Sequence, residues 1–174
     1  MIAAQAQVEV REVTFTEISA RASGEWCRLL LEESTGRVQL ISSWGTYSYR
    51  WTSIGNQTLP AFLAQCDWHY LASKFLGTDA YVFDQPETAV GLMEWICRAR
   101  RSGDLSKDQA REEWDLASQL RRGDISWEGW GSSTSLCDPW EFGKRIPNPQ
   151  WVRFWEVLWE PLVRPALKEM HRST

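Results

Sequence analysis

The chain has 174 residues, of which 43% are hydrophobic, 24% are charged and twelve are tryptophan, and its net charge is −4. This composition excludes a disordered or low-complexity protein, and the length allows one ordinary hydrophobic core or at most two small ones. The longest aliphatic run, residues 29–31, is too short to cross a bilayer, and the first residues lack the basic and apolar regions of a signal peptide. We therefore expect a cytoplasmic protein that does not enter the membrane.

The cysteines lie far apart in the sequence, and no two of them form a C-x-x-C pair. Only His69 and His171 are available to complete a metal site, and neither has the spacing of a zinc ligand. The sequence therefore predicts reduced, mostly buried thiols, and it predicts neither a metal nor another cofactor.

Residues 1–57 carry the apolar patterns of β-strands. Alternation or short apolar runs over residues 8–15, 26–31, 38–40 and 46–51 predict a meander of three or four antiparallel strands. Another short apolar run, Tyr81 to Phe83, is a candidate further strand of the same sheet.

Residues 58–123 predict helices. The first extends from the suitable N-cap Thr58 to Gly77. The next two cover residues 84–103 and 106–123, each ending at a glycine, and the later one begins with a Ser-x-x-Gln capping box. Because only a short turn joins these two helices, we expect them to form an antiparallel hairpin.

The remaining segments are a loop and a last helix. Residues 124–149, rich in glycine, serine and tryptophan, predict a long loop with at most one short helical turn. Residues 150–171 predict a helix that Pro161 and Pro165 kink or restart. Together these elements predict an α+β fold in which residues 1–174 form a single domain. Its small N-terminal antiparallel sheet, of three to five strands, packs against three to five helices.

The tryptophans fall into groups with different expected roles. Six lie on or beside apolar stripes and are predicted to fill the core, namely Trp26, Trp95, Trp114, Trp151, Trp155 and Trp159. The aromatic strand is a candidate stacking platform for nucleic acid, although a core ladder is the favoured interpretation, and it contains Tyr47, Tyr49, Arg50 and Trp51. The predicted loop suits a protein interface and core packing equally, and it contains Trp127, Trp130 and Trp140.

The sequence contains no recognised catalytic motif. The nucleophile elbow, the P-loop, the dinucleotide-binding motif and the zinc-protease motif are all absent. Trp68 and His69 on the first predicted helix are kept as binding candidates, although a structural role is favoured for His69. Residues 132–135 beside Gly131 can form an anion-binding nest, although polar loop filler is favoured. The sequence therefore favours a protein that is not an enzyme, without excluding one.

Basic residues gather at two predicted helix ends, and they are Arg98, Arg100, Arg101, Arg121 and Arg122. The favoured interpretation is that they complement the helix dipoles and keep the surface soluble, and a local binding patch is the alternative. Arg111 and Asp115, four residues apart, are expected to form an ion pair. The negative net charge disfavours long-range attraction of free nucleic acid.

Three motifs resemble those of a family of small proteins encoded by phages and prophages. They are W-G-x-Y-S-Y-x-W at residues 44–51, A-R-x-x-W-D at residues 110–115, and N-P-x at residues 148–150 followed by Phe154 and Trp155. The resemblance covers roughly residues 25–170. It implies an accessory gene product that acts in the bacterial cytoplasm, and it assigns no catalytic residue.

The leading hypothesis is an accessory protein that binds an unidentified host protein complex and inhibits or redirects it, as an inhibitor of a CRISPR effector or another defence complex does. An acidic surface on such a protein competes with nucleic acid for basic grooves on the host complex. The alternative is a small nucleotide- or nucleic-acid-binding protein or enzyme that uses residues 46–51. A third hypothesis is self-association through an exposed tryptophan face.

Overall fold

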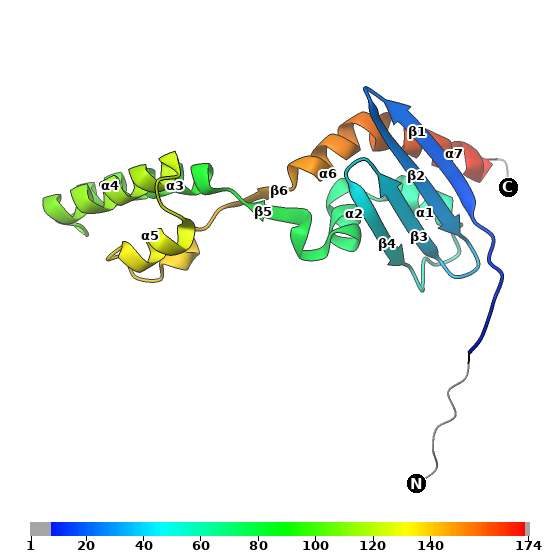
Figure 1. The fold of residues 1–174 in the computed structure, drawn as a ribbon, viewed down its shortest axis with the longest axis horizontal. Helices are drawn as coiled ribbons and strands as arrows, with labels where there is room; N and C mark the ends of the chain where they lie inside the picture. The colour runs from blue at the N-terminus through cyan, green and yellow to red at the C-terminus, as the bar shows by residue number, and fades with distance from the viewer. Residues whose placement is uncertain (1–7, 173–174) are drawn as a thin grey trace, which may run out of the picture. The chain divides into compact units, whose positions relative to one another are not determined.

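The structure, a computed structural model, describes residues 8–172 and has the predicted α+β fold (Figure 1). Its contacts divide the chain into two compact units. Unit 1 comprises Met1–Ala80 and Pro149–Thr174, and unit 2 comprises Tyr81–Asn148. That both units unfold together, as a single domain would, stays a prediction.

Unit 1 contains a four-stranded antiparallel sheet in the order β1-β2-β3-β4. The strands are β1 (Thr16–Ala22), β2 (Glu25–Glu32), β3 (Arg37–Ser42) and β4 (Gly45–Arg50). Alternation along β2 buries Cys27, Leu29 and Leu31 on one face, and Leu29 lies opposite Leu40 of β3. The predicted meander is therefore confirmed from β1 onward.

The strand expected at residues 8–15 is absent. Val8 and Val10 are 88% and 91% exposed, and β1 begins only at Thr16. Alternating valines form a strand only where a neighbouring strand pairs with them and a core covers one face, and this segment has neither in the described chain.

The turn between β2 and β3 requires its glycine. Gly36 has a φ of +68°, and a Cβ at this position would lie 2.0 Å from the carbonyl oxygen of Trp51. The amide of Trp51 donates to the carbonyl of Gly36 at 2.8 Å. A side chain at position 36 would therefore separate the end of β4 from this turn.

Helices cover one face of the sheet (Figure 1). They are α1 (Leu59–Gln65), α2 (Trp68–Phe75), α6 (Pro149–Phe154) and α7 (Arg164–Arg172), with a 3-10 turn, η1 (Gly77–Ala80), after α2. Thr58 caps α1 as predicted. The single helix expected from Thr58 to Gly77 is wrong, because Cys66 is extended and Asp67 caps a new helix by accepting a hydrogen bond from the Tyr70 amide.

The C-terminal helix is continuous from α6 through α7. Between them, a π-helical stretch, η3 (Trp155–Val163), contains Pro161. The amide of Arg164 bonds to the carbonyl of Trp159, five residues back. The chain thus accommodates the proline, which lacks a backbone N–H, by widening the helix rather than by ending it. Pro165, at the junction of η3 and α7, also lacks a backbone N–H, and the helix continues through it.

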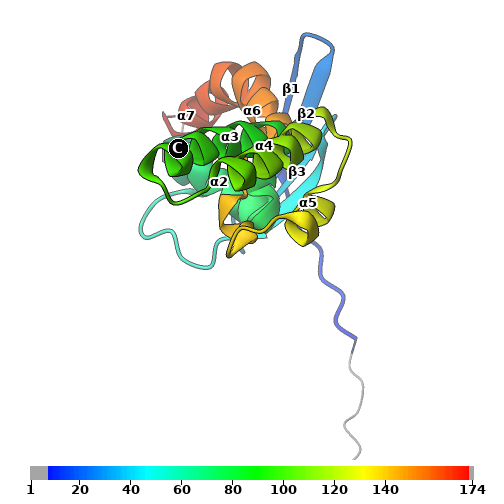
Figure 2. The ribbon, with the colours of Figure 1, turned by 90° about the vertical axis from the view of Figure 1, so that its left-hand side faces the viewer.

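Unit 2 is built on the predicted helical hairpin, in which α3 (Gln85–Ser102) lies beside α4 (Lys107–Arg122) (Figures 1 and 2). The Ser106 capping box begins α4, and glycines with positive φ end both helices, as predicted. A core of Leu92, Ile96 and Leu120 fills the interface between the helices.

The rest of unit 2 differs from the predicted loop. It contains α5 (Trp127–Ser133), a 3-10 turn, η2 (Pro139–Phe142), and β6 (Arg145–Pro147). The strand β5 (Tyr81–Phe83) exists, but it pairs with β6 in a separate two-stranded sheet and does not extend the large one. The abundance of glycine suggested a loop, whereas α5 forms because Ser126 caps it by accepting from the Gly129 amide and Trp130 anchors it in the core.

Candidate functional site

The predicted loop contributes to a series of contacting aromatic rings that runs from the core of unit 2 to its surface. Trp130 is 1% exposed and stacks on Trp127, with ring centroids 4.8 Å apart. Trp127 in turn contacts Trp140 at 5.8 Å and Phe83 at 5.2 Å. Trp140 is 58% exposed and Phe83 is 39% exposed. We call Phe83, Trp127 and Trp140 the surface aromatic patch.

Two glycines pack against the rings of this patch. A Cβ built on Gly131 would lie 2.8 Å from Cη2 of Trp140, so the ring occupies the space of a missing side chain. At Gly143 a Cβ would lie 3.5 Å from Cζ2 of Trp127, an ordinary contact distance. The indole of Trp140 is therefore fixed against α5 while much of its area stays in solvent.

A buried carboxylate holds the segment after α5 in place. Glu113 of α4 is 2% exposed and accepts hydrogen bonds from the hydroxyl of Thr134 and from the amide and hydroxyl of Ser135, the last two at 2.8 and 2.7 Å. Ser132 and Ser133 donate to carbonyls within α5. The anion that this serine-rich run binds is thus the protein's own Glu113.

The three candidate tryptophans of the predicted loop therefore differ in their exposure to solvent. Trp130 is 1% exposed and packs in the core of unit 2, and a binding role for it stays a prediction. Trp127 is half-buried against the core of unit 2 and Trp140 is exposed, and a binding role for either residue stays a prediction. The sequence alone could not separate them because glycine spacing obscured the helix α5.

The aromatic strand lies on the covered face of the large sheet. Trp51 is 6% exposed, and its indole donates to the hydroxyl of Tyr70 at 2.9 Å. Tyr47 packs edge-on against Trp151, and Tyr49 against Trp51. Burial, with a smaller contribution from the negative charge of Asp79, raises the pKa of Tyr47. The favoured core-ladder interpretation is therefore confirmed.

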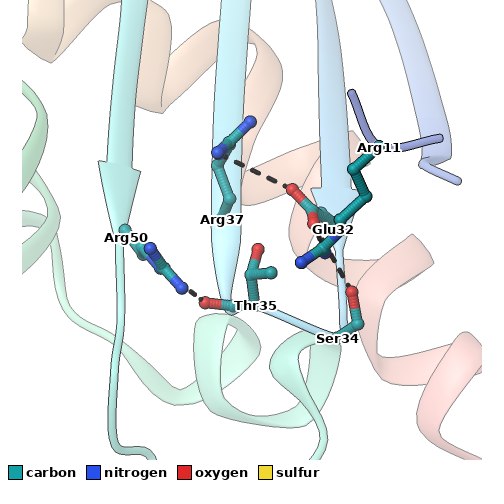
Figure 3. Close-up of polar contacts among 6 residues, drawn as sticks. All are labelled: Arg11, Glu32, Ser34, Thr35, Arg37 and Arg50. Atoms are coloured by element: carbon teal, nitrogen blue, oxygen red, sulfur yellow. Dashed lines mark hydrogen bonds and ion pairs between the residues drawn. The ribbon is translucent and has the colours of Figure 1, made fainter. Parts of the chain in front are cut away.

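Arg50 points to the opposite, uncovered face, where a buried glutamate gathers arginines (Figure 3). Glu32 is 1% exposed and pairs with Arg11 at 2.9 Å and with Arg37 at 3.6 Å. Arg50 lies opposite Arg37 in register and donates to the carbonyl of Thr35 at 3.1 Å. Strand parity in β2, β3 and β4 places Glu32, Arg37 and Arg50 on one face, and this signal could have predicted the cluster from the sequence.

The other two binding candidates lie at the start of α2. The rings of Trp68 and His69 stack with centroids 4.3 Å apart. His69 is exposed and Trp68 is half-buried, and the Trp68 carbonyl accepts from the indole of Trp151 at 3.4 Å. The structure thus shows Trp68 as part of the packing of unit 1, and a ligand-binding role for either residue stays a prediction.

The core prediction is right for most of its six tryptophans and wrong for two. Trp151 and Trp159 are buried, and Trp95 and Trp155 are half-buried. Trp26 is 38% exposed, because it alternates with the buried Cys27 and so lies on the uncovered face of the sheet. Trp114 is 40% exposed at the open edge of the α3–α4 hairpin.

The cysteines show no reactive arrangement in the described chain. All four are free, with Cys27 and Cys66 buried, Cys97 half-buried and Cys137 exposed. Burial raises the pKa of Cys27 and of Cys66 to about 11. Among residues 8–172 no group of three histidine, cysteine or acidic side chains is placed to hold a metal. Within the same range no helix combines the length and apolar character needed to span a membrane.

A family model described as a phage family matches residues 6–169. Comparison with curated proteins and with solved structures gives no match.

Proposed function

Because the chain belongs to the Phage_phiTE_072 family of phage proteins, we propose that it is an accessory binding protein that attaches to a host protein complex and inhibits or redirects it. The contact is made by the surface aromatic patch of unit 2. The observation that carries this proposal is Trp140, a tryptophan whose ring packs against Gly131 while 58% of its surface stays in solvent.

Such a residue suits a protein interface more than it suits a stable monomer surface. Tryptophan and tyrosine are enriched among the residues that dominate binding energy, since one rigid ring buries a large area at little cost in side-chain entropy. Phe83 and Trp127 extend the apolar area around Trp140. A partner that covers the patch therefore removes a contiguous aromatic surface from water.

Charge around the patch indicates the kind of partner surface. Residues 126–143 contain three acidic side chains and no basic one, and Asp138 and Glu141 are exposed beside Trp140. Arg145, opposite Phe83 in register, places a positive charge at the other side of the patch. The acidic side, beside Trp140, complements a basic groove of the kind that host complexes use for nucleic acid. Occupation of such a groove blocks the host complex, and defence complexes such as CRISPR effectors are one class that has these grooves.

The test is quantitative co-precipitation from lysate of the bacterial host, with the wild-type protein, Trp140→Ala and Trp26→Ala. The two variants each remove one exposed tryptophan, but Trp26 belongs to unit 1 and is not part of the patch. We expect the wild type and Trp26→Ala to recover the same stoichiometric partner, and Trp140→Ala to bind it about 30-fold more weakly, as at a typical interface hot spot.

Two results would overturn the proposal. One is the absence of any stoichiometric partner together with unchanged host defence when the protein is expressed. The other is a dimer in light scattering that Trp140→Ala dissociates, because the patch would then serve self-association.

A further inference from the structure

A second exposed tryptophan of unit 2 lies in a strongly basic setting. Trp114 of α4 lines each of three neighbouring hollows along the α3–α4 hairpin, which have volumes of about 540, 350 and 450 Å³. Ile96 and Cys97 contribute apolar lining to the largest hollow, and Met93 contributes to the other two. An indole that is 40% exposed therefore separates adjoining depressions of the size that small ligands occupy.

Basic side chains surround these hollows. Seven of them line one or more hollows, namely Arg98, Arg100, Arg101, Lys107, Arg111, Arg121 and Arg122. Only two carboxylates, Glu94 and Asp115, share the lining. We call Trp114 with these seven cations the Trp114 face. It has the opposite sign to unit 2 as a whole, which carries nine basic and twelve acidic side chains.

The cations of this face are mostly without partners inside the described protein. Arg122 pairs with Asp124 at 2.7 Å. The other six form no ion pair and donate no hydrogen bond to any described residue, and the pair expected between Arg111 and Asp115 is not formed. Complementing a helix dipole accounts for Arg100, Arg101, Arg121 and Arg122 in the last turns of α3 and α4, but it does not account for Lys107 and Arg111 in the first half of α4.

We propose that the Trp114 face binds single-stranded nucleic acid. The exposed indole stacks on one base, because every base has a π-face that an aromatic ring can cover. The guanidinium groups around the adjoining hollows bind the phosphates that flank this base. The combination of one aromatic platform with surrounding cations is the pattern of binders that hold a single strand without reading its sequence.

The overall charge of −4 sets the strength and range of this binding. Long-range attraction is weak because the rest of unit 2 is acidic, so the strand is held by short-range contacts at the face itself. This surface and the surface aromatic patch use different residues. The nucleic-acid site and the proposed host-complex site can therefore be tested, and can fail, separately.

The test is fluorescence anisotropy of a labelled single-stranded DNA 20-mer and its RNA counterpart, titrated with the full chain at several salt concentrations. We expect binding that weakens with salt, with a slope of about −0.7 in log K against log salt for each phosphate contacted. Trp114→Ala is expected to weaken binding about 5- to 150-fold, and Trp114→Phe to weaken it less, because a phenyl ring still stacks.

Two matched variants measure the charge contribution. Arg101→Gln removes a cation that lines two of the hollows, and Arg153→Gln removes an exposed cation of unit 1. Arg101→Gln should reduce the magnitude of the salt slope by about 0.7, and Arg153→Gln should leave the slope unchanged. Circular dichroism checks that each variant is folded, and since both arginines are exposed we expect all spectra to agree.

Several outcomes would overturn the proposal. The absence of binding at low salt would do so, as would equal effects of Arg101→Gln and Arg153→Gln. Duplex DNA binding as tightly as the single strand would contradict base stacking on Trp114. Polyglutamate of matched charge competing as well as the oligonucleotide, with Trp114→Ala unaffected, would instead assign the face to an acidic protein partner.

Discussion

The arginine clusters of the two units are used in opposite ways. In unit 1, Arg11 and Arg37 pair with Glu32, and Arg28 binds Glu17 through two hydrogen bonds of 2.8 and 2.7 Å. In unit 2, six of the seven cations of the Trp114 face have no partner within the described chain. These three arginines of unit 1 therefore fasten strands and turns to each other, whereas six cations of the Trp114 face are left available to other molecules. Counting basic residues along the sequence does not show this difference, because it depends on which face each residue occupies.

Among the substitutions that compare the two units, Trp130→Ala should cause the largest loss of stability. Removing an indole that is 1% exposed from the core of unit 2 should cost about 3–5 kcal/mol of unfolding free energy. Hydrogen exchange of peptides from each unit shows where this cost appears. We expect lost protection in residues 81–148 and unchanged protection in the large sheet. Equal loss in both units would mean that they unfold together as the single domain that the sequence predicts.

Glu113→Ala should have the next largest effect. It removes the acceptor of three hydrogen bonds and leaves the amide of Ser135 without a partner, so we expect a loss of about 2–4 kcal/mol in chemical denaturation. The neighbouring Glu112→Ala removes an exposed carboxylate and should change stability by less than about 0.5 kcal/mol. Similar losses in the two variants would contradict the role of Glu113 as the anchor of residues 134–135.

Glu32→Ala in unit 1 should cost about 1–2 kcal/mol, since its partners Arg11 and Arg37 are half-exposed and water screens part of the attraction. The exposed Glu12→Ala is the control. The prediction is contradicted if Glu32→Ala lowers the urea midpoint no more than Glu12→Ala does. The ion pairs of Arg11 and Arg37 with Glu32 would then contribute nothing measurable to stability.

The smallest effect concerns pH. Hydrogen bonds from Arg28 and Ser19, and the charge of Arg28, lower the pKa of Glu17 from 4.5 to about 2. A depressed folded-state pKa stabilises the folded protein above the unfolded value, and this contribution disappears as the pH falls to about 2. The melting temperature of the wild type should therefore exceed that of Glu17→Gln near pH 5, and the difference should vanish near pH 2. A difference in melting temperature that stays constant from pH 5 to pH 2 would contradict a stabilising ion pair between Glu17 and Arg28.

Local sequence signals predicted much of the fold. The N-caps Thr58 and Ser106, the helix-ending glycines Gly103 and Gly123, and alternation in β2 to β4 each depend on a few neighbouring residues, so they could be recognised in one sequence. The break at Asp67 was missed because the apolar pattern continues across it. The helix α5 was missed because its stability depends on the burial of Trp130 more than on its composition.

The candidate site could be predicted only in part. The place of Trp127 and Trp140 among glycines suggests a binding surface, and the structure exposes Trp140 but leaves Trp127 half-buried. Trp114 was assigned to the core because it lies beside an apolar stripe, and only the packing of α3 on α4 shows that its side chain is left at the open edge. Exposure of one residue on a helix depends on the partner helix, and periodicity does not specify that partner.

Oxidative footprinting of the twelve tryptophans, with the protein free and bound to the partner recovered from host lysate, tests the central claim most directly. In the free protein, Trp140, Trp114 and Trp26 should be oxidised fastest, because they are 58%, 40% and 38% exposed. Bound to the host complex, Trp140 should be protected while Trp26 stays reactive. Unchanged oxidation of Trp140 in the complex, or protection of Trp26 in its place, would contradict the claim that the surface aromatic patch is the binding site.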